Sequence, residues 1–281
     1  MVSEIKEFAA RDRTRIFYRE WKGKENGDII LYLHGLESHM GWFIDTGNLL
    51  SQKGFHIYAV DRRGSGMSQA DRGHMESYWT LLEDVKEVTE LARRKHPEGK
   101  LYLMGLCWGG VVAATFACHH QNLIDGLILL SPAIKTKVDL PLKQKIDVVF
   151  SSIFRPHKLF DVPLDDWMFT RNPKYLDFVK KDGLKLRKAT ARFFFETRKI
   201  NLCLDRIAHK IHIPVLVLLA GDDVIIDNEK VKKWFTAIGS KDKTINVFGG
   251  CYHNLQFEKD VENIINYIAD WIRREKKGEE D

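Results

Sequence analysis

"LYLMGLCWGG", residues Leu101 to Gly110, joins an apolar run to the spacing G-x-Cys-x-G. Gly105 and Gly109 stand two residues before and two residues after Cys107. This spacing is typical of a nucleophile elbow, a sharp turn from a strand into a helix that presents its central side chain. Side chains at the two glycine positions would clash across such a turn. The stretch therefore predicts that Cys107 ends a strand and begins a helix, whose dipole favours a thiolate.

Apolar runs of the same kind recur along the chain and indicate a largely parallel sheet that is buried on both faces. Between them lie helical patterns, among them residues 77–97, which end in basic residues before a proline. Residues from 260 onward predict a final amphipathic helix with a charged end. The alternation of strands and helices predicts the α/β class. The strand-like runs are "IILYLHG" (29–35), "HIYAVDRRG" (56–64), "GLILLSP" (126–132), "PVLVLLAG" (214–221) and "TINVFGG" (244–250).

The alternation stops after Pro132, and about eighty residues pass before Pro214 begins the next run. A plain crossover needs far fewer residues. We therefore expect residues 133–208 to form a helical cap over the carboxyl ends of the strands, inserted between core residues 1–132 and 209–281. Helix-like patches at "LKQKIDVVFSSIF" (142–154) and "GLKLRKATARFFFETRKI" (183–200) support the cap, with Phe193, Phe194 and Phe195 in its apolar core or, alternatively, lining an acyl pocket.

A nucleophile at an elbow needs an acid and then a histidine later in the chain. Asp223 follows an expected strand in "GDDVIID", and His253 follows the last expected strand in "GGCYHNLQFE". We favour Asp223 over Asp222 and Asp227 because it directly precedes the apolar residues. A carboxylate there would orient the imidazole and stabilise its cation. The order predicts a triad of Cys107, His253 and Asp223. The alternatives are that Cys107 is a buried structural cysteine, that Asp223 belongs to a solvated acidic turn, and that His253 is an exposed loop histidine.

Backbone amides at two places predict an oxyanion hole. Trp108 directly follows the nucleophile, and Leu36 lies in "LHGLESH" after the first strand-like run. His34 in that stretch could act as a base, but we favour a structural role because His253 has the better chain position. "DRRGSGMS", Asp61 to Ser68, lacks the lysine of a phosphate-binding loop and the spacing of a dinucleotide fingerprint, so it predicts a tight loop after a strand.

Cysteine usage and the chain's start predict a cytoplasmic protein. Cys107, Cys118, Cys203 and Cys251 are irregularly spaced without a C-x-x-C pair, which suggests reduced thiols rather than a zinc site or a disulfide framework. A disulfide between Cys251 and Cys107 is a minor alternative. The chain holds no apolar run long enough to cross a bilayer, and its first residues lack the apolar region of an export signal.

Positive charge is concentrated in the expected cap. The net charge of the chain is +5, but residues 134–199 hold sixteen Lys and Arg against eight Asp and Glu. A solvated face explains this most simply. The alternative is a surface that meets anionic lipid headgroups or phosphates. No nucleic acid partner is expected.

The motifs together resemble the α/β hydrolase superfamily, and within it the group of monoacylglycerol lipases and lysophospholipases, which is similar to the S33 serine aminopeptidases. The resemblance implies that Cys107 is the nucleophile, Asp223 the acid and His253 the base, with the amides of Leu36 and Trp108 as the oxyanion hole. It also implies a carboxylic ester with a fatty acyl chain under the cap, and no metal or organic cofactor. The matching stretches are "LHGLESHMGWF", "AVDRRGSGMS", "MGLCWGG", "LSPAI", "FDVPL", "FTRNPKY", "PVLVLLAGDDVIID" and "YHNLQFE".

Cys107 departs from the serine that this group normally carries. Dienelactone hydrolases and polyhydroxyalkanoate synthases are relatives that use cysteine, the latter in a similar G-x-C-x-G-G frame. A cysteine beside a histidine can start as a thiolate and form a thioester with the acyl group. We therefore predict an ester hydrolase, with an acyltransferase or thioesterase that uses an acyl-Cys intermediate as the alternative. A hydrolase-fold protein that binds a ligand without turnover, and an engineered Ser→Cys variant, are further alternatives.

Overall fold

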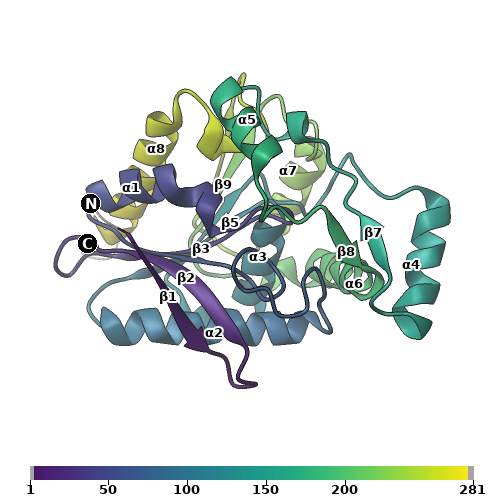
Figure 1. The fold of residues 1–281 in the computed structure, drawn as a ribbon. Coiled ribbons are helices and arrows are strands. Elements are labelled where there is room, and N and C mark those ends of the chain that lie inside the picture. The colour runs from purple at the N-terminus through teal and green to yellow at the C-terminus, as the bar shows by residue number, and fades with distance from the viewer. Residues whose placement is uncertain (1–2, 278–281) are drawn as a thin grey trace.

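A mostly parallel sheet forms the centre of the molecule (Figure 1). The computed structural model describes residues 3–277, and within them eight strands pair in the order β1-β2-β4-β3-β5-β6-β9-β10. β1 and β2 form an antiparallel hairpin, β2 is antiparallel to β4, and the remaining neighbours are parallel. The predicted α/β hydrolase architecture is confirmed. The strands are β1 (Glu4–Ala9), β2 (Arg15–Trp21), β3 (Ile29–Leu33), β4 (His56–Val60), β5 (Leu101–Leu106), β6 (Gly126–Leu130), β9 (Val215–Ala220) and β10 (Lys243–Phe248).

The register of the parallel strands brings the candidate residues to one edge of the sheet. β3, β5, β6 and β9 are buried along their whole length, as their unbroken apolar runs predict. Leu33 at the end of β3 pairs with Gly105, and Leu106 at the end of β5 pairs with Leu130. The loops that follow these strands, including Cys107, therefore emerge side by side at the carboxyl edge.

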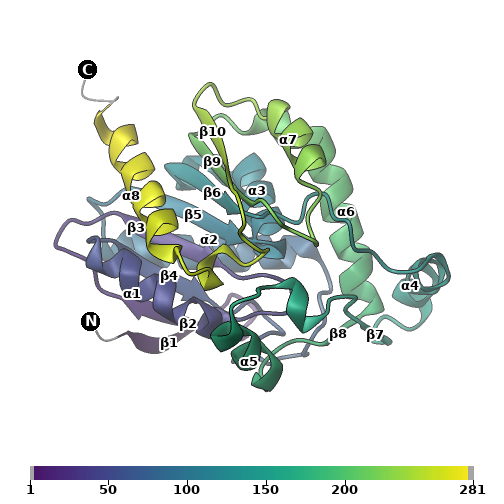
Figure 2. The ribbon, with the colours of Figure 1, turned by 90° about the horizontal axis from the view of Figure 1, so that it is seen from above.

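Helices cover both faces of the sheet, as Figure 2 shows. α1 and α8 lie on one face, and α2, α3, α6 and α7 lie on the other. Right-handed crossovers explain this division, because the direction in which a connection moves across the sheet decides which face its helix covers. The connection from β3 to β4 moves in the opposite direction to those from β5 to β6 and from β9 to β10. The helices are α1 (Ile44–Gln52), α2 (Tyr78–Lys95), α3 (Trp108–His120), α6 (Ala191–Ile207), α7 (Asn228–Thr236) and α8 (Val261–Lys277), with short 3-10 turns at Met40–Phe43, Gln121–Leu123, Ala208–Lys210 and Leu255–Phe257.

Residues 133–208 hold α4 (Leu142–Phe154), β7 (Leu159–Asp161), a 3-10 turn (Asp166–Met168), α5 (Pro173–Lys181), β8 (Lys188–Thr190) and α6. α4 has the bounds that the sequence predicts. The helix predicted from residue 183 begins only at Ala191, because Lys188–Thr190 pairs with β7 and the Thr190 hydroxyl caps α6 by accepting from the Phe193 amide. We refer to residues 133–208 as the cap segment.

α4 lies at the edge of the molecule, away from the sheet, in both views (Figures 1 and 2). In residues 3–277, no helix combines the length and the apolar character needed to cross a membrane. The charged end predicted for the last helix falls partly on residues 278–281, which lie outside the described residues.

Candidate active site

Cys107 stands at the turn between β5 and α3, as the elbow spacing predicts. Its φ of 54° and ψ of −119° lie in a region that residues with side chains rarely adopt. A Cβ at Gly105 would come within 2.4 Å of the Gly109 carbonyl oxygen, and a Cβ at Gly109 within 2.2 Å of the Leu33 carbonyl oxygen. The two glycines are therefore required for the turn to close against β3.

The loops after β9 and β10 bring Asp223 and His253 together. His253 Nδ1 and Asp223 Oδ2 are 2.8 Å apart, and both side chains are buried. The other carboxylate oxygen of Asp223 accepts from the amides of Ile225 and Ile226 at 2.8 and 2.9 Å. Asp222 is exposed, whereas Asp227 caps α7. Of the three acids in this loop, only Asp223 contacts the histidine.

The electrostatics of this group favour a charged imidazole. Burial alone would lower the pKa of His253, but the Asp223 carboxylate and the nearby Cys107 sulfur outweigh it and raise this pKa to about 10. Burial alone would raise the pKa of Asp223, but the charge of His253 outweighs burial and lowers it. His253 Nε2 has no hydrogen-bond partner of ordinary geometry within residues 3–277, and His253 lines the same cavity as Cys107. The arrangement places a charged imidazole on the same cavity as the Cys107 thiol.

The loop after β3 packs directly against the elbow. A Cβ at Gly35 would come within 3.2 Å of the Cys107 Cβ, and Leu36 lines the cavity beside Cys107. Trp108 is the first residue of α3. Backbone N–H groups in the first turn of a helix have no partner within the helix and can therefore donate to an anion. Leu36 and Trp108 thus lie next to Cys107 on the two segments where an oxyanion hole was expected, and the roles of their amides stay a prediction.

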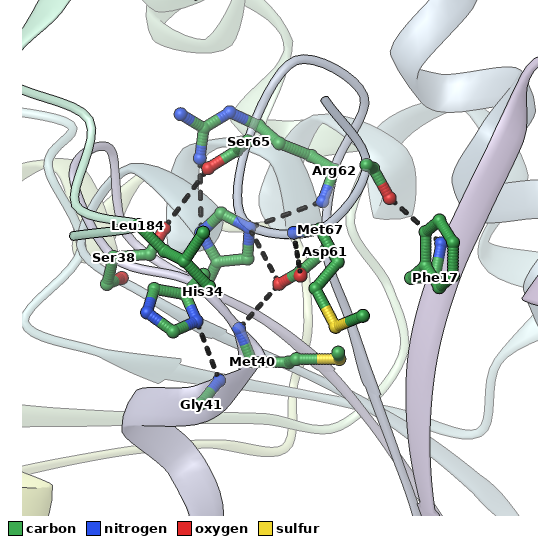
Figure 3. Close-up of polar contacts among 12 residues, drawn as sticks. Phe17, His34, Ser38, Met40, Gly41, Asp61, Arg62, Ser65, Met67 and Leu184 are labelled. Carbon is green, nitrogen blue, oxygen red and sulfur yellow. Dashed lines mark hydrogen bonds and ion pairs between the residues drawn. The ribbon is translucent and has the colours of Figure 1, made fainter. Parts of the chain in front are cut away.

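Arg62 is a buried cation that sequence reasoning missed (Figure 3). Its Nη1 donates to the Gly35 carbonyl at 3.0 Å, and its Nη2 donates to the Leu36 carbonyl. Its guanidinium carbon lies 5.0 Å from the centre of a Trp108 ring. Burial lowers the pKa of Arg62 to about 9. Two adjacent cations in "DRRG" suggest solvent exposure, so the sequence holds no signal for this contact. We refer to the contacted loop after β3, residues 34–39, as the oxyanion loop.

His34 has the structural role that we favoured. Its Nδ1 is 2.7 Å from the Gly35 carbonyl, and its Nε2 accepts from the Arg62 amide at 3.2 Å (Figure 3). Burial holds the pKa of His34 well below its ordinary value, so the ring is neutral. Asp61 beside it accepts from the amides of Met40 and Met67 at 2.6 and 2.7 Å, which closes the tight loop predicted for "DRRGSGMS".

The cap segment closes the site. The cavity beside Cys107 measures about 10 Å³, which is no more than one water molecule needs. Leu164 and Phe169 of the cap segment line it, and the Phe169 carbonyl accepts from the Asn254 amide at 2.8 Å. Phe193 stacks on Trp108 at 5.1 Å between ring centres and so belongs to the main core, whereas Phe194 and Phe195 pack against a small cluster within the cap segment. With the cap segment in this position, the cavity beside Cys107 has no room for a molecule larger than water.

A buried ion pair ties the cap segment to the oxyanion loop. Lys185 Nζ lies 2.6 Å from Glu37 Oε2, and Lys185 also pairs with Asp166. Burial raises the pKa of Glu37 to about 7 despite this partner. The amide of Leu186 donates to the Glu37 carbonyl at 2.9 Å. Sequence analysis missed this contact because the partners are about 150 residues apart and belong to different expected domains.

Cys118 and Cys251 are poorly suited to nucleophilic chemistry. All four cysteines lie in the described part of the chain and are free. Burial raises the pKa of Cys118 to about 12, and burial with nearby carboxylates raises the pKa of Cys251 to about 11. Cys107 is the cysteine that lies beside a histidine and at a helix start.

Similarity to known proteins agrees with this geometry. Phospholipase YtpA of Bacillus subtilis is 27% identical over 249 residues, which span 87% of this chain and 94% of the phospholipase. Monoglyceride lipase of Mus musculus is 22% identical over 93% of this chain and 88% of the lipase. The crystal structure of Paleococcus ferrophilus monoacylglycerol lipase matches with a TM-score of 0.82 at 25% identity, over 91% of this chain and 97% of the other. The family model described as "Serine aminopeptidase, S33" matches residues 24–260. The chain belongs to this S33 family of α/β hydrolases.

Proposed function

We propose that this protein is a carboxylic ester hydrolase of the lipase and esterase type that acts through Cys107, His253 and Asp223. The single observation that carries the proposal is the buried His253, held by Asp223 at 2.8 Å and placed on the same cavity as the elbow thiol. The prediction of a hydrolase that acts on ester bonds is confirmed by the relatives, because they are named lipases and phospholipases. A monoacylglycerol or a lysophospholipid is the substrate class that these names favour.

The geometry suggests a two-step reaction. The Cys107 thiolate attacks the ester carbonyl carbon, and the amides of Leu36 and Trp108 stabilise the oxyanion. The tetrahedral intermediate collapses to a thioester as the carbon–oxygen bond breaks, and imidazolium His253 gives its Nε2 proton to the leaving alkoxide. Neutral His253 then takes a proton from water, which attacks the thioester and releases the acid. The proton on His253 returns the site to its thiolate and imidazolium state, while Asp223 orients the ring throughout.

The cap segment suits a substrate from a lipid surface. Six apolar side chains of α4 are more than half exposed and follow helical spacing, so they form one face. Basic residues in and directly after α4, among them Lys143 and Arg155, fit the anionic headgroups considered for the cap. We propose that this face rests on lipid while the cap segment moves to admit an acyl chain, in a protein of the cytoplasm. The exposed side chains are Leu142, Ile146, Val149, Phe150, Ile153 and Phe154.

Turnover of short-chain nitrophenyl esters tests the nucleophile, because such substrates are small and soluble. The wild type should hydrolyse them and should gain the mass of one acyl group when quenched with acid before deacylation. Cys107→Ala should lose both the turnover and the adduct. Cys107→Ser should form the more stable oxygen ester and shows whether the site accepts either nucleophile. Equal turnover by wild type and Cys107→Ala would remove the proposal.

Acyl transfer is the second candidate, and Cys107 itself favours it. A thioester intermediate passes its acyl group readily to an alcohol, an amine or a thiol. Incubation with acyl-CoA and glycerol or lysophospholipid, followed by mass spectrometry, separates the candidates. A transferred acyl product would favour the transferase, and free fatty acid alone would favour hydrolysis of thioesters and esters. A bound ligand without any adduct or product would favour the non-catalytic alternative.

A further inference from the structure

Three metal-ligating side chains meet at a junction between the core and the cap segment, away from Cys107. Asp71 and His74 belong to the core loop between β4 and α2, and His157 belongs to the cap segment between α4 and β7. One ligand atom from each lies within 4.8 Å of the others. His74 is buried, whereas Asp71 and His157 are exposed and accessible to an ion from solvent. Neither the elbow chemistry nor the oxyanion loop uses these residues.

The spacing of the donor atoms suits a tetrahedral transition-metal ion. Zinc–ligand bonds of about 2.0–2.1 Å at tetrahedral angles separate neighbouring donors by about 3.4 Å. His157 Nδ1 lies 3.5 Å from Asp71 Oδ1, and His74 Nε2 lies 3.8 Å from Asp71 Oδ2. Glu76 Oε2 lies 3.3 Å from His74 Nε2, but Glu76 is outside the group whose ligand atoms all lie within 4.8 Å of one another. Two imidazoles with a carboxylate form a donor set that suits Zn²⁺ better than Ca²⁺ or Mg²⁺.

The buried histidine has an orienting partner behind it. His74 Nδ1 lies 3.0 Å from the Thr190 hydroxyl, so a proton on Nδ1 leaves the Nε2 lone pair for the ion. Histidines that bind metals usually donate their second nitrogen in this way, which fixes the tautomer and the ring orientation. The exposed His157 ring stacks on His74 with ring centres 4.1 Å apart and planes 15° apart. An imidazole binds a metal in its own ring plane, so His157 must turn out of this stack to share an ion with His74.

The backbone around the cluster is already joined between core and cap segment. The Thr190 amide donates to the Gly73 carbonyl at 2.9 Å, and a Cβ at Gly73 would come within 2.7 Å of the Lys188 carbonyl oxygen. The Ala191 amide donates to the Lys158 carbonyl at 2.8 Å, which anchors the loop that carries His157. These contacts hold both loops in place before an ion binds. Binding therefore costs little conformational entropy of the backbone.

We propose that Asp71, His74 and His157, with water in the fourth position, bind one Zn²⁺ ion that fastens the cap segment to the core. The resemblance to the hydrolase group implies no metal, so this ion would depart from that expectation, and it would lie away from Cys107. By joining the two segments, the ion opposes movement of the cap segment and so restrains the opening that an acyl chain needs. The proposal stands on the cluster's own geometry and does not depend on the nucleophile.

Titration of tag-free, chelator-treated protein with Zn²⁺ and with Co²⁺ tests the site. We expect one ion per chain by calorimetry, and the visible bands of tetrahedral Co²⁺ in absorption. Asp71 has a φ of 51°, which asparagine tolerates, so Asp71→Asn removes the charge without straining the loop. Asp71→Asn and His157→Ala should each weaken Zn²⁺ binding at least tenfold. His209→Ala, an exposed histidine outside the cluster, is the matched control and should leave binding unchanged.

Hydrogen exchange supplies a second readout that is independent of activity. Zn²⁺ should protect residues 71–76 and 156–161 together in the wild type, and neither segment in His157→Ala. The same titration in Cys107→Ala removes the thiol of the elbow as a competing ligand and should retain the site. Binding that survives both Asp71→Asn and His157→Ala would overturn the proposal, and so would binding that is lost in Cys107→Ala.

Discussion

His253 and Asp223 are joined through Nδ1 and Oδ2 over 2.8 Å, and both side chains are withdrawn from solvent. Because Nδ1 is taken by this contact, Nε2 of His253 is the nitrogen that can exchange a proton with a nucleophile or a leaving group. A carboxylate in this position stabilises an imidazolium. An imidazolium held in this way would favour the thiolate form of a neighbouring thiol at the elbow.

Iodoacetamide should alkylate Cys107 faster near neutral pH than Cys118 or Cys251, whose thiols burial holds protonated. His253→Ala should slow the alkylation of Cys107 because the cation that favours its thiolate is gone. Asp223→Asn should slow it less. Peptide mass mapping over a series of pH values measures each site. A Cys107 rate that ignores His253→Ala would show that the elbow is intact but its nucleophile is not activated.

The stability of the protein should fall in alkaline solution because of His253. Its pKa is raised to about 10 in the folded state, so the folded protein holds this proton more tightly than the unfolded chain. This contribution is fully present below about pH 6.5, the ordinary histidine value, and is lost as the pH rises towards 10. Urea unfolding at several pH values should show this loss in the wild type. His253→Ala should lack it, and parallel profiles for the two proteins would contradict the assignment.

The central strands and the elbow could be predicted from the sequence because local patterns determine them. Six apolar runs correspond to β3, β4, β5, β6, β9 and β10. The β1–β2 hairpin was missed, since its strands are partly exposed and carry charged residues among their apolar ones. α5 was also missed, although Asn172 as cap and Pro173 at the first position are a start signal that could have found it.

Contacts between distant segments were beyond the sequence. Local patterns do not reveal that Arg62 turns inward to two carbonyls of the oxyanion loop, or that Lys185 is buried against Glu37. Both residue types are usually exposed, so burial of either is unexpected until a partner is seen. The order nucleophile, acid, histidine was sufficient to predict that Cys107, Asp223 and His253 lie at one edge of the sheet, because each follows a strand, while their catalytic roles stay a prediction.

Arg62→Lys should lower kcat by about tenfold to 100-fold with little change in KM. An ammonium group cannot donate to both the Gly35 and Leu36 carbonyls in the fixed fork of a guanidinium, so the Leu36 amide loses its position. Steady-state kinetics on a short-chain ester measures both constants. Arg63→Lys is the matched control, because Arg63 pairs with Asp84 and should affect stability rather than kcat. A raised KM with unchanged kcat would instead indicate a role in substrate binding.

Lys185→Met should destabilise the protein by roughly 3–5 kcal/mol above pH 7, because it leaves the buried Glu37 carboxylate without its partner. Below pH 7 the cost should shrink, since the pKa of Glu37 is already raised to about 7 by burial and the group can take up a proton. Urea unfolding on either side of pH 7 measures the difference. Glu37→Gln combined with Lys185→Met should recover part of the loss, and a cost that is equal at both pH values would contradict this account.

Phe150→Asp combined with Ile153→Asp should abolish binding to lipid vesicles while hydrolysis of a soluble short-chain ester continues. Both side chains lie on the exposed apolar face of α4, with 60% and 68% of their surfaces accessible. Burying such a side chain contributes about 1.5–3 kcal/mol, so two charged replacements remove most of the apolar attraction. Vesicle sedimentation with neutral and anionic lipid measures binding, and added salt separates the share due to Lys143 and Arg155.

Val247→Asp is the matched control for this experiment, because Val247 is an exposed apolar residue on β10, far along the chain from the cap segment. It should leave vesicle binding unchanged. If α4 rests on lipid, its double variant should also lose activity on long-chain monoacylglycerol presented in vesicles, since such a substrate leaves the bilayer only at that surface. Loss of activity on the soluble ester as well would point instead to a damaged cap segment, and unchanged vesicle binding would show that another face meets the lipid.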